Sequence, residues 1–140
     1  MKIAQKLKHL GKIVMFSGFF IHRRVTTKAS WHYDFQGTNS GAFTLMAPLY
    51  TMPDACCHLL YEENGREKKK IYRVGKAVVF GDDVHHTTQP GALKKPMGFI
   101  CFTLGRSDMT ATEWKNARDY IKSQTGIYKT PSGKVVKSRN

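Results

Sequence analysis

The 140-residue sequence predicts a mainly β domain with one α-helix near its C-terminus. Short apolar and aromatic segments follow one another at close spacing, and Gly, Pro and Asn turn signals separate them. Asn64-Gly65 lies between two alternating segments and is a strong hairpin signal. A single helical pattern comes after the last apolar segment. This order favours a sandwich, a barrel or a jelly roll over an α/β sheet.

The first half of the chain contains one expected helix and three expected strands. Residues 2–10 are rich in lysine and predict a short basic helix that ends at Gly11. The apolar run 13–21 predicts a buried strand and is too short to cross a bilayer, which takes about 20 residues. Residues 30–35 and 42–50 predict the second and third strands, with a Gly/Asn/Ser turn between them.

The next strands are expected to form a meander. Residues 56–63 and 68–74 alternate apolar with polar side chains around Asn64-Gly65, as a half-solvated antiparallel pair does. After Gly75 the pattern predicts a strand, a turn near Gly81-Asp82, a second short strand and a stop at Pro90-Gly91. Residues 97–105 predict the last strand of this series.

The helix is expected over about residues 109–125. Thr110 and Glu113 form a capping-box signature, and Trp114, Ala117 and Ile121 share one face. Gly126 can end the helix. Residues 1–126 are therefore expected to form one domain, and 127–140 a mobile basic tail.

Composition limits the classes of partner and compartment. The formal charge of +13 attracts anions of many kinds, but no nucleic-acid-binding module accompanies it, so we expect it to serve solubility and steering. Nucleic-acid binding is thus not expected, although the charge leaves it open. Three cysteines give no even disulfide framework, which favours a reducing, cytoplasmic location. The lysine-rich start keeps an organellar presequence as an alternative.

Two segments carry candidate metal ligands. Asp34 is the first acidic residue of the chain and follows His32 by two positions, so on a strand both side chains point to one face. On such a strand Trp31, Tyr33 and Phe35 point to the other face. His85 and His86 follow a distant apolar strand, and one of them can complete the two-His, one-carboxylate set of mononuclear non-haem iron sites.

These segments resemble a known family. In order, "WHYDF", "GKAVVFGDDVHHTTQPG" and "FICFTLG" look like the core of the Fe(II)/2-oxoglutarate-dependent dioxygenases of the prolyl- and phytanoyl-hydroxylase type. The resemblance implies a double-stranded β-helix, a jelly-roll or cupin-like fold, with His32, Asp34 and His86 as metal ligands. His86 is selected over His85 because it follows Phe80 by six positions and precedes Pro90 by four.

The resemblance also implies the co-substrate and the reaction. Lys95, or Lys94 as the alternative, is expected to bind the far carboxylate of 2-oxoglutarate, and Tyr50 to donate a hydrogen bond to it. With Fe(II), 2-oxoglutarate and O2, such a site hydroxylates a substrate and releases succinate and CO2. The substrate is expected to be a small molecule or a peptidyl side chain, with a mild preference for acidic ones. Oligomeric state stays open.

Two other classes of function remain alternatives. A cupin-type metalloprotein that does not use 2-oxoglutarate would keep the triad but need no lysine. A non-catalytic basic β-domain would bind nucleic acid or an acidic partner through its charge, and salt would weaken that binding steeply.

Overall fold

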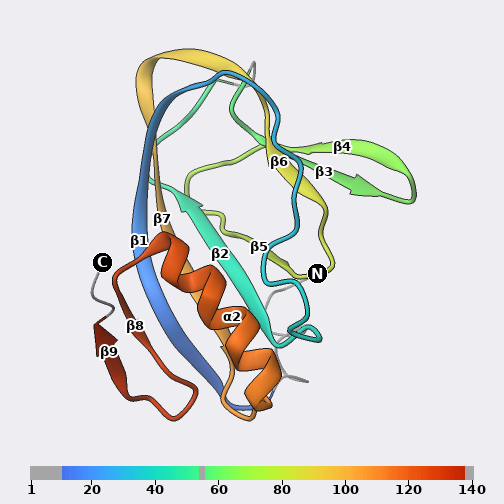
Figure 1. Cartoon of the computed structure of the whole chain (residues 1–140). Coiled ribbons are helices and arrows are strands. Elements are labelled where there is room, and N and C mark those ends of the chain that lie inside the picture. The colour runs from blue at the N-terminus through green and yellow to red at the C-terminus, as the bar shows by residue number, and fades with distance from the viewer. Residues whose placement is uncertain (1–10, 54–55, 138–140) are drawn as a thin grey trace.

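The computed structural model describes residues 11–53 and 56–137 (Figure 1). The helix expected over residues 2–10 lies outside these ranges. The described residues form a mainly β architecture with one helix in the C-terminal part of the chain, as the sequence predicts.

The larger sheet has four antiparallel strands in the order β1-β7-β2-β5. Its strands are β1 (Ile13–Thr26), β2 (Ala42–Pro48), β5 (Val78–Gly81) and β7 (Gly91–Arg106). Both β1 and β7 are longer than the apolar runs that predicted them. Their pairing continues beyond these runs into segments that contain Lys and Arg. Figure 1 shows β1 and β7 running side by side along the length of the sheet.

A smaller sheet contains the predicted hairpin. Its strands β3 (Leu59–Glu63) and β4 (Arg66–Lys70) pair on either side of a two-residue turn, and β6 (His86–Thr88) pairs with β3. Asn64 and Gly65 have φ values of 53° and 69°, the left-handed conformations that a type I′ turn requires. The hairpin prediction is confirmed.

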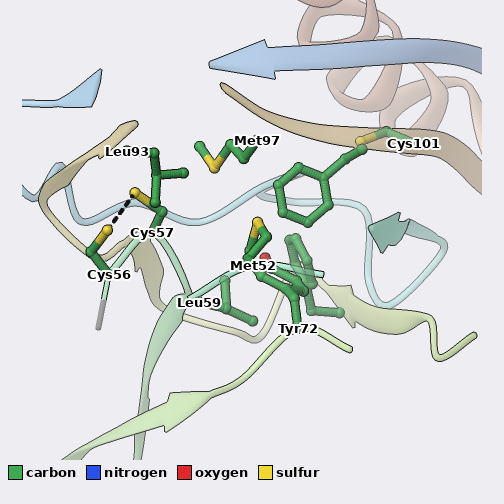
Figure 2. Packing of buried hydrophobic residues seen from close by; sticks show 10 residues of the cluster. Met52, Cys56, Cys57, Leu59, Tyr72, Leu93, Met97 and Cys101 are labelled. Atoms are coloured by element: carbon green, nitrogen blue, oxygen red, sulfur yellow. Dashed lines mark hydrogen bonds between the residues drawn. The ribbon is translucent and has the colours of Figure 1, made fainter. Parts of the chain in front are cut away.

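The two sheets enclose one apolar cluster, shown in Figure 2. Leu59 comes from the smaller sheet, and Phe80, Met97 and Phe99 come from the larger one. Cys101 of β7 is fully buried in the same cluster. Sheets that face each other across a shared core form the sandwich-like layering expected for a jelly roll.

Residues 30–35 do not form the predicted strand. His32 makes one isolated bridge with His86, and the chain then turns. Phe35 has a φ of 52°, which is incompatible with an extended strand, and its side chain is buried against Tyr120 of the helix. Phe35 therefore does not share a face with Trp31 and Tyr33, because burial of its ring in a second cluster outweighs strand continuation.

The helix α2 (Ala111–Gln124) covers the other face of the larger sheet (Figure 1). Thr110 and Glu113 form the predicted capping box, and the chain leaves the helix at Thr125. A second apolar cluster lies beneath the helix and contains Phe16, Phe35, Ala42, Ala117, Ile121 and Tyr128. Among the described residues, no helix is long and apolar enough to span a membrane.

The residues that follow the helix, expected to be a mobile basic tail, include two short strands. β8 (Ile127–Lys129) and β9 (Val135–Lys137) form a hairpin, and Tyr128 is buried in the second cluster. The hairpin was not predicted from the sequence because this segment is basic and Tyr128 is its one buried side chain among the described residues.

Candidate metal centre

His32 and His86 face each other because their backbones pair. The N–H of each residue donates to the carbonyl of the other at 3.0 Å, which closes one ring of an antiparallel ladder. Directly opposed side chains lie on the same face of such a pair, and the two imidazole rings are 4.5 Å apart between centroids. A single β-bridge thus brings together His32 and His86, which are more than fifty residues apart in the sequence.

Asp34 brings a carboxylate to the two rings. Its Oδ1 lies 3.4 Å from Nε2 of His32 and 3.7 Å from Nε2 of His86. Thr44 donates its hydroxyl hydrogen to Oδ2 at 3.1 Å, and Tyr120 donates to Oδ1. One donor comes from β2 and the other from α2, so the two layers on either side of the loop hold the carboxylate.

The three residues have the composition of a metal site. One ligand atom from each lies within 4.8 Å of the others, and within the described ranges no other group of His, Cys, Asp and Glu does this. Asp34 and His86 are buried, whereas His32 is about half exposed. The site therefore opens toward solvent on the His32 side.

Hydrogen bonds fix which nitrogen of each ring is free. Nδ1 of His32 lies 2.7 Å from the carbonyl oxygen of Ser30, and Nδ1 of His86 lies 2.9 Å from that of Val84. A carbonyl can only accept, so both Nδ1 atoms carry a hydrogen, and in the neutral form of each ring Nε2 presents its lone pair toward Asp34. Backbone carbonyls that orient the rings in this way are usual behind metal-binding histidines.

Burial lowers the pKa of His86. The hydrogen bond to Val84 and the charge of Asp34 act in the opposite direction but do not overcome burial. His86 is therefore neutral near pH 7, which is the state that binds a metal ion.

His85 directly precedes β6, and its side chain does not join the triad. Its Nδ1 is 2.8 Å from Oε2 of Glu62, and its ring stacks on Tyr33 at 4.7 Å and lies near Trp31. With its ring held by Glu62 and Tyr33, His85 points away from Asp34, and only His86 of the two faces the carboxylate.

The triad opens into a cavity of about 200 Å³ between the sheets. Phe19, Ile21 and Arg23 line it from β1, and Arg23 supplies the one Lys or Arg side chain among the described residues that line it. Gln124 of α2 also lines the cavity, and its buried Oε1 has no hydrogen-bond partner in the described part of the chain. These groups can meet a polar ligand beside the triad.

The residues expected to hold 2-oxoglutarate lie elsewhere. Lys94, Lys95 and Tyr50 line a different cavity, and they are absent from the lining of the triad cavity. Tyr50 donates its hydroxyl hydrogen to the carbonyl of Pro96. Their placement does not support the expected contacts with a co-substrate at the triad. The reason is an irregularity in β7, where the residues that carry the lysines bulge out of the ladder with β1.

Arg23 and Tyr120 were not among the residues singled out from the sequence. The alternation of Phe19, Ile21 and Arg23 on a strand is a signal that the arginine shares the face of the two apolar residues, where its exposed side chain lines the cavity. Tyr120 and Gln124 are four positions apart on α2 and so share a helical face, but nothing in the sequence indicates that this face meets Asp34.

No family model and no curated protein matches this chain. Solved structures do resemble it: the non-haem monooxygenase ThoJ in a nickel complex aligns with a TM-score of 0.62 at 14% identity, over 76% of this chain and 50% of that one. Apo ThoJ aligns with a TM-score of 0.64 at 12% identity, over 96% and 56%. A cupin protein from Bacteroides fragilis aligns with a TM-score of 0.44 at 13% identity, over 79% and 86%.

The likeness to ThoJ concerns the fold. The chain spans about half the length of ThoJ, and the identity is low. Together with the two-sheet architecture, it confirms the fold class predicted from the sequence, a mainly β, jelly-roll-like domain with a C-terminal helix.

Proposed function

We propose that this chain is a metal-dependent, non-haem oxygenase that holds Fe(II) at His32, Asp34 and His86 and uses 2-oxoglutarate to hydroxylate a substrate. The observation that carries the proposal is the convergence of two Nε2 lone pairs and one carboxylate oxygen, with both ring tautomers fixed from behind. Three ligands on one side of an ion leave positions free for a co-substrate and O2. The fold shared with ThoJ, which is named a non-haem monooxygenase and has a nickel complex, supports the same class.

Each residue of the site has a separate role in this proposal. His32 and His86 supply neutral nitrogen ligands, and Asp34 supplies the negative charge that favours a divalent ion. Tyr120 and Thr44 hold the carboxylate in position. When bound, ferrous iron supplies oxygen activation: one O2 is consumed, 2-oxoglutarate becomes succinate and CO2, and a substrate C–H bond becomes C–OH.

Arg23 is the proposed contact for the far carboxylate of 2-oxoglutarate, in place of Lys95. It lines the triad cavity, and its guanidinium can bind a carboxylate with two parallel hydrogen bonds. The cavity of about 200 Å³ suits a compact co-substrate. Its lining combines apolar side chains with the triad and with other polar groups such as Arg23, Thr44 and Gln124, so it can contact both the methylene groups and the carboxylates of the co-substrate.

The experiment is an anaerobic Fe(II) titration with and without 2-oxoglutarate, followed by visible absorbance and by succinate release in air. We expect a weak charge-transfer band that needs both components and disappears in Asp34→Ala. Arg23→Met should raise the 2-oxoglutarate concentration required by about ten- to a hundredfold while iron binding is kept, because hydrogen bonds to charged groups contribute about 1.5–3 kcal/mol. Arg73→Met, an exposed arginine outside the triad cavity, is the matched control.

A metalloprotein that does not use 2-oxoglutarate is the second candidate. The specific observation in its favour is that neither lysine at the position suggested by the family lines the triad cavity. Iron binding without the band, and without any effect of Arg23→Met, would favour this candidate over the oxygenase. A failure of iron to bind would contradict both.

A further inference from the structure

The cavity lined by Lys94 and Lys95 is much larger than the triad cavity. The triad cavity measures about 200 Å³, which is below the range of about 300–1,000 Å³ that is usual for ligand pockets. The second cavity measures about 860 Å³ and lies well within that range. A substrate of ordinary size therefore fits the second cavity better than the first.

A bulge in β7 builds one wall of the second cavity. Val25 pairs with Ala92 and Arg23 pairs with Met97, so the segment 93–96 leaves the β1–β7 ladder. Nε of Arg24 donates to the carbonyl of Leu93 at 3.2 Å. The hydroxyl of Tyr50 donates to the carbonyl of Pro96, so side chains hold the bulge at both of its ends. Bulges beside functional sites re-aim side chains in this way.

The wall and floor of the cavity combine apolar surface with positive charge. Met52, Leu93 and Met97 are buried members of the core cluster and line the cavity. Lys94 and Lys95 are exposed and line it from the bulge. No acidic residue is among the described residues that line it. An apolar molecule that ends in an anionic group complements this lining in both respects.

The second cavity adjoins the triad cavity. Met97 lines both of them, and Cys56 lines the larger one while its neighbour Cys57 lines the smaller one. Figure 2 shows Leu93 and Met97 beside the two cysteines within the core cluster. Methionine is flexible and adapts its shape to its contacts, so this shared wall can yield to a ligand.

We infer that the cavity lined by the β7 bulge binds a small amphiphilic anion, with its chain or ring system on Met52, Leu93 and Met97 and its anionic group at Lys94 and Lys95. That this ligand is the molecule hydroxylated at the triad rests on the proposed function. The binding itself needs neither metal nor 2-oxoglutarate, so it is measured separately.

The test is calorimetric titration of the whole metal-free chain with hexanoate, octanoate and decanoate. Each added CH2 group should tighten the Kd by about fourfold, since burial of one CH2 contributes about 0.8 kcal/mol and 1.4 kcal/mol is tenfold in Kd. Decyltrimethylammonium, which has the same tail and the opposite charge, should bind at least tenfold more weakly than decanoate.

Four variants test where the site lies. Lys94→Glu/Lys95→Glu should weaken decanoate binding at least tenfold, whereas Lys129→Glu/Lys134→Glu, an equal charge change at the C-terminal hairpin, should change it less than twofold. Ala92→Trp adds bulk at an exposed lining position without removing core atoms, and should weaken decanoate binding at least tenfold as well. Asp34→Ala should bind decanoate as the unaltered chain does.

The outcomes separate this inference from the proposed function. Absence of decanoate binding, absence of a chain-length dependence, or equal weakening by the two double charge reversals would overturn the inference. If the unaltered chain binds no iron, and both it and Asp34→Ala bind decanoate, the anion site is supported and the oxygenase is contradicted. If the chain releases succinate, alkyl carboxylates that bind should increase the release, and unchanged release would overturn their assignment as the substrate class.

Discussion

Replacing each of the two adjacent histidines in turn tests which one is the metal ligand. In the metal-free chain, His86→Ala removes a buried ring that contacts Phe80 and leaves the carbonyl of Val84 without its hydrogen bond. An unsatisfied acceptor costs about 1–3 kcal/mol when it is buried, and this carbonyl is partly buried. His85→Ala removes a partly exposed contact with Glu62 and a ring contact with Tyr33, and a hydrogen bond of this kind contributes about 0.5–1.5 kcal/mol. His86→Ala is therefore expected to be the less stable variant even without metal.

The metal adds a second, separable effect on stability. An ion at a hundred times its Kd stabilises the folded state by about 2.7 kcal/mol, which for a domain of this size raises the Tm by roughly 8–10 °C. His85→Ala should keep this rise in full. If His86→Ala weakens binding a hundredfold, the same metal concentration only equals the new Kd, and the rise shrinks to roughly 1–2 °C.

Thermal unfolding followed by circular dichroism measures both quantities, with Fe(II) under nitrogen and with Ni(II) or Co(II) in air. The metal-induced rise is taken within each variant, so the difference in metal-free stability cancels. A full rise in His86→Ala together with a lost rise in His85→Ala would refute the assignment of the distal ligand. An equal loss of the metal-induced rise in both variants would mean that β6 is displaced. It would refute the placement of His85 away from the metal site.

Three further predictions follow from the described contacts. Tyr120→Phe should weaken metal binding about ten- to a hundredfold, the usual cost of removing a group that orients a metal ligand, and an unchanged titration curve would show that Thr44 alone holds the carboxylate of Asp34. The pKa of His86 in the folded chain lies below its ordinary value of 6.5, so the unfolded chain takes up this proton first as the pH falls. The free energy of unfolding of the metal-free chain should therefore decrease below about pH 6.5. Urea unfolding measures this decrease, which should be weaker in His86→Ala. Thr110→Ala should cost about 0.5–2 kcal/mol by loss of the helix cap, while the same change at the exposed Thr112 should cost less, and equal effects in thermal unfolding would contradict the capping box.

The sequence by itself determined the features that depend on local spacing. Asn64-Gly65 specifies a hairpin because few residue pairs adopt two left-handed conformations in succession. Thr110 and Glu113 specify the start of α2 because their side chains bond to backbone groups three residues away. The His-x-Asp spacing likewise placed His32 and Asp34 together, even though the segment turns instead of forming a strand.

Only the tertiary structure decided which distant groups meet these residues. Arg23 and Tyr120 reach the site through strand pairing and helix packing, and their distances from Asp34 along the chain carry no signal of this. Lys94 and Lys95 have the expected spacing from His86, but the bulge before Met97 turns them to another cavity. A strand's register sets the position of every side chain that follows, and a local motif cannot encode a register shift that is fixed by the neighbouring strand.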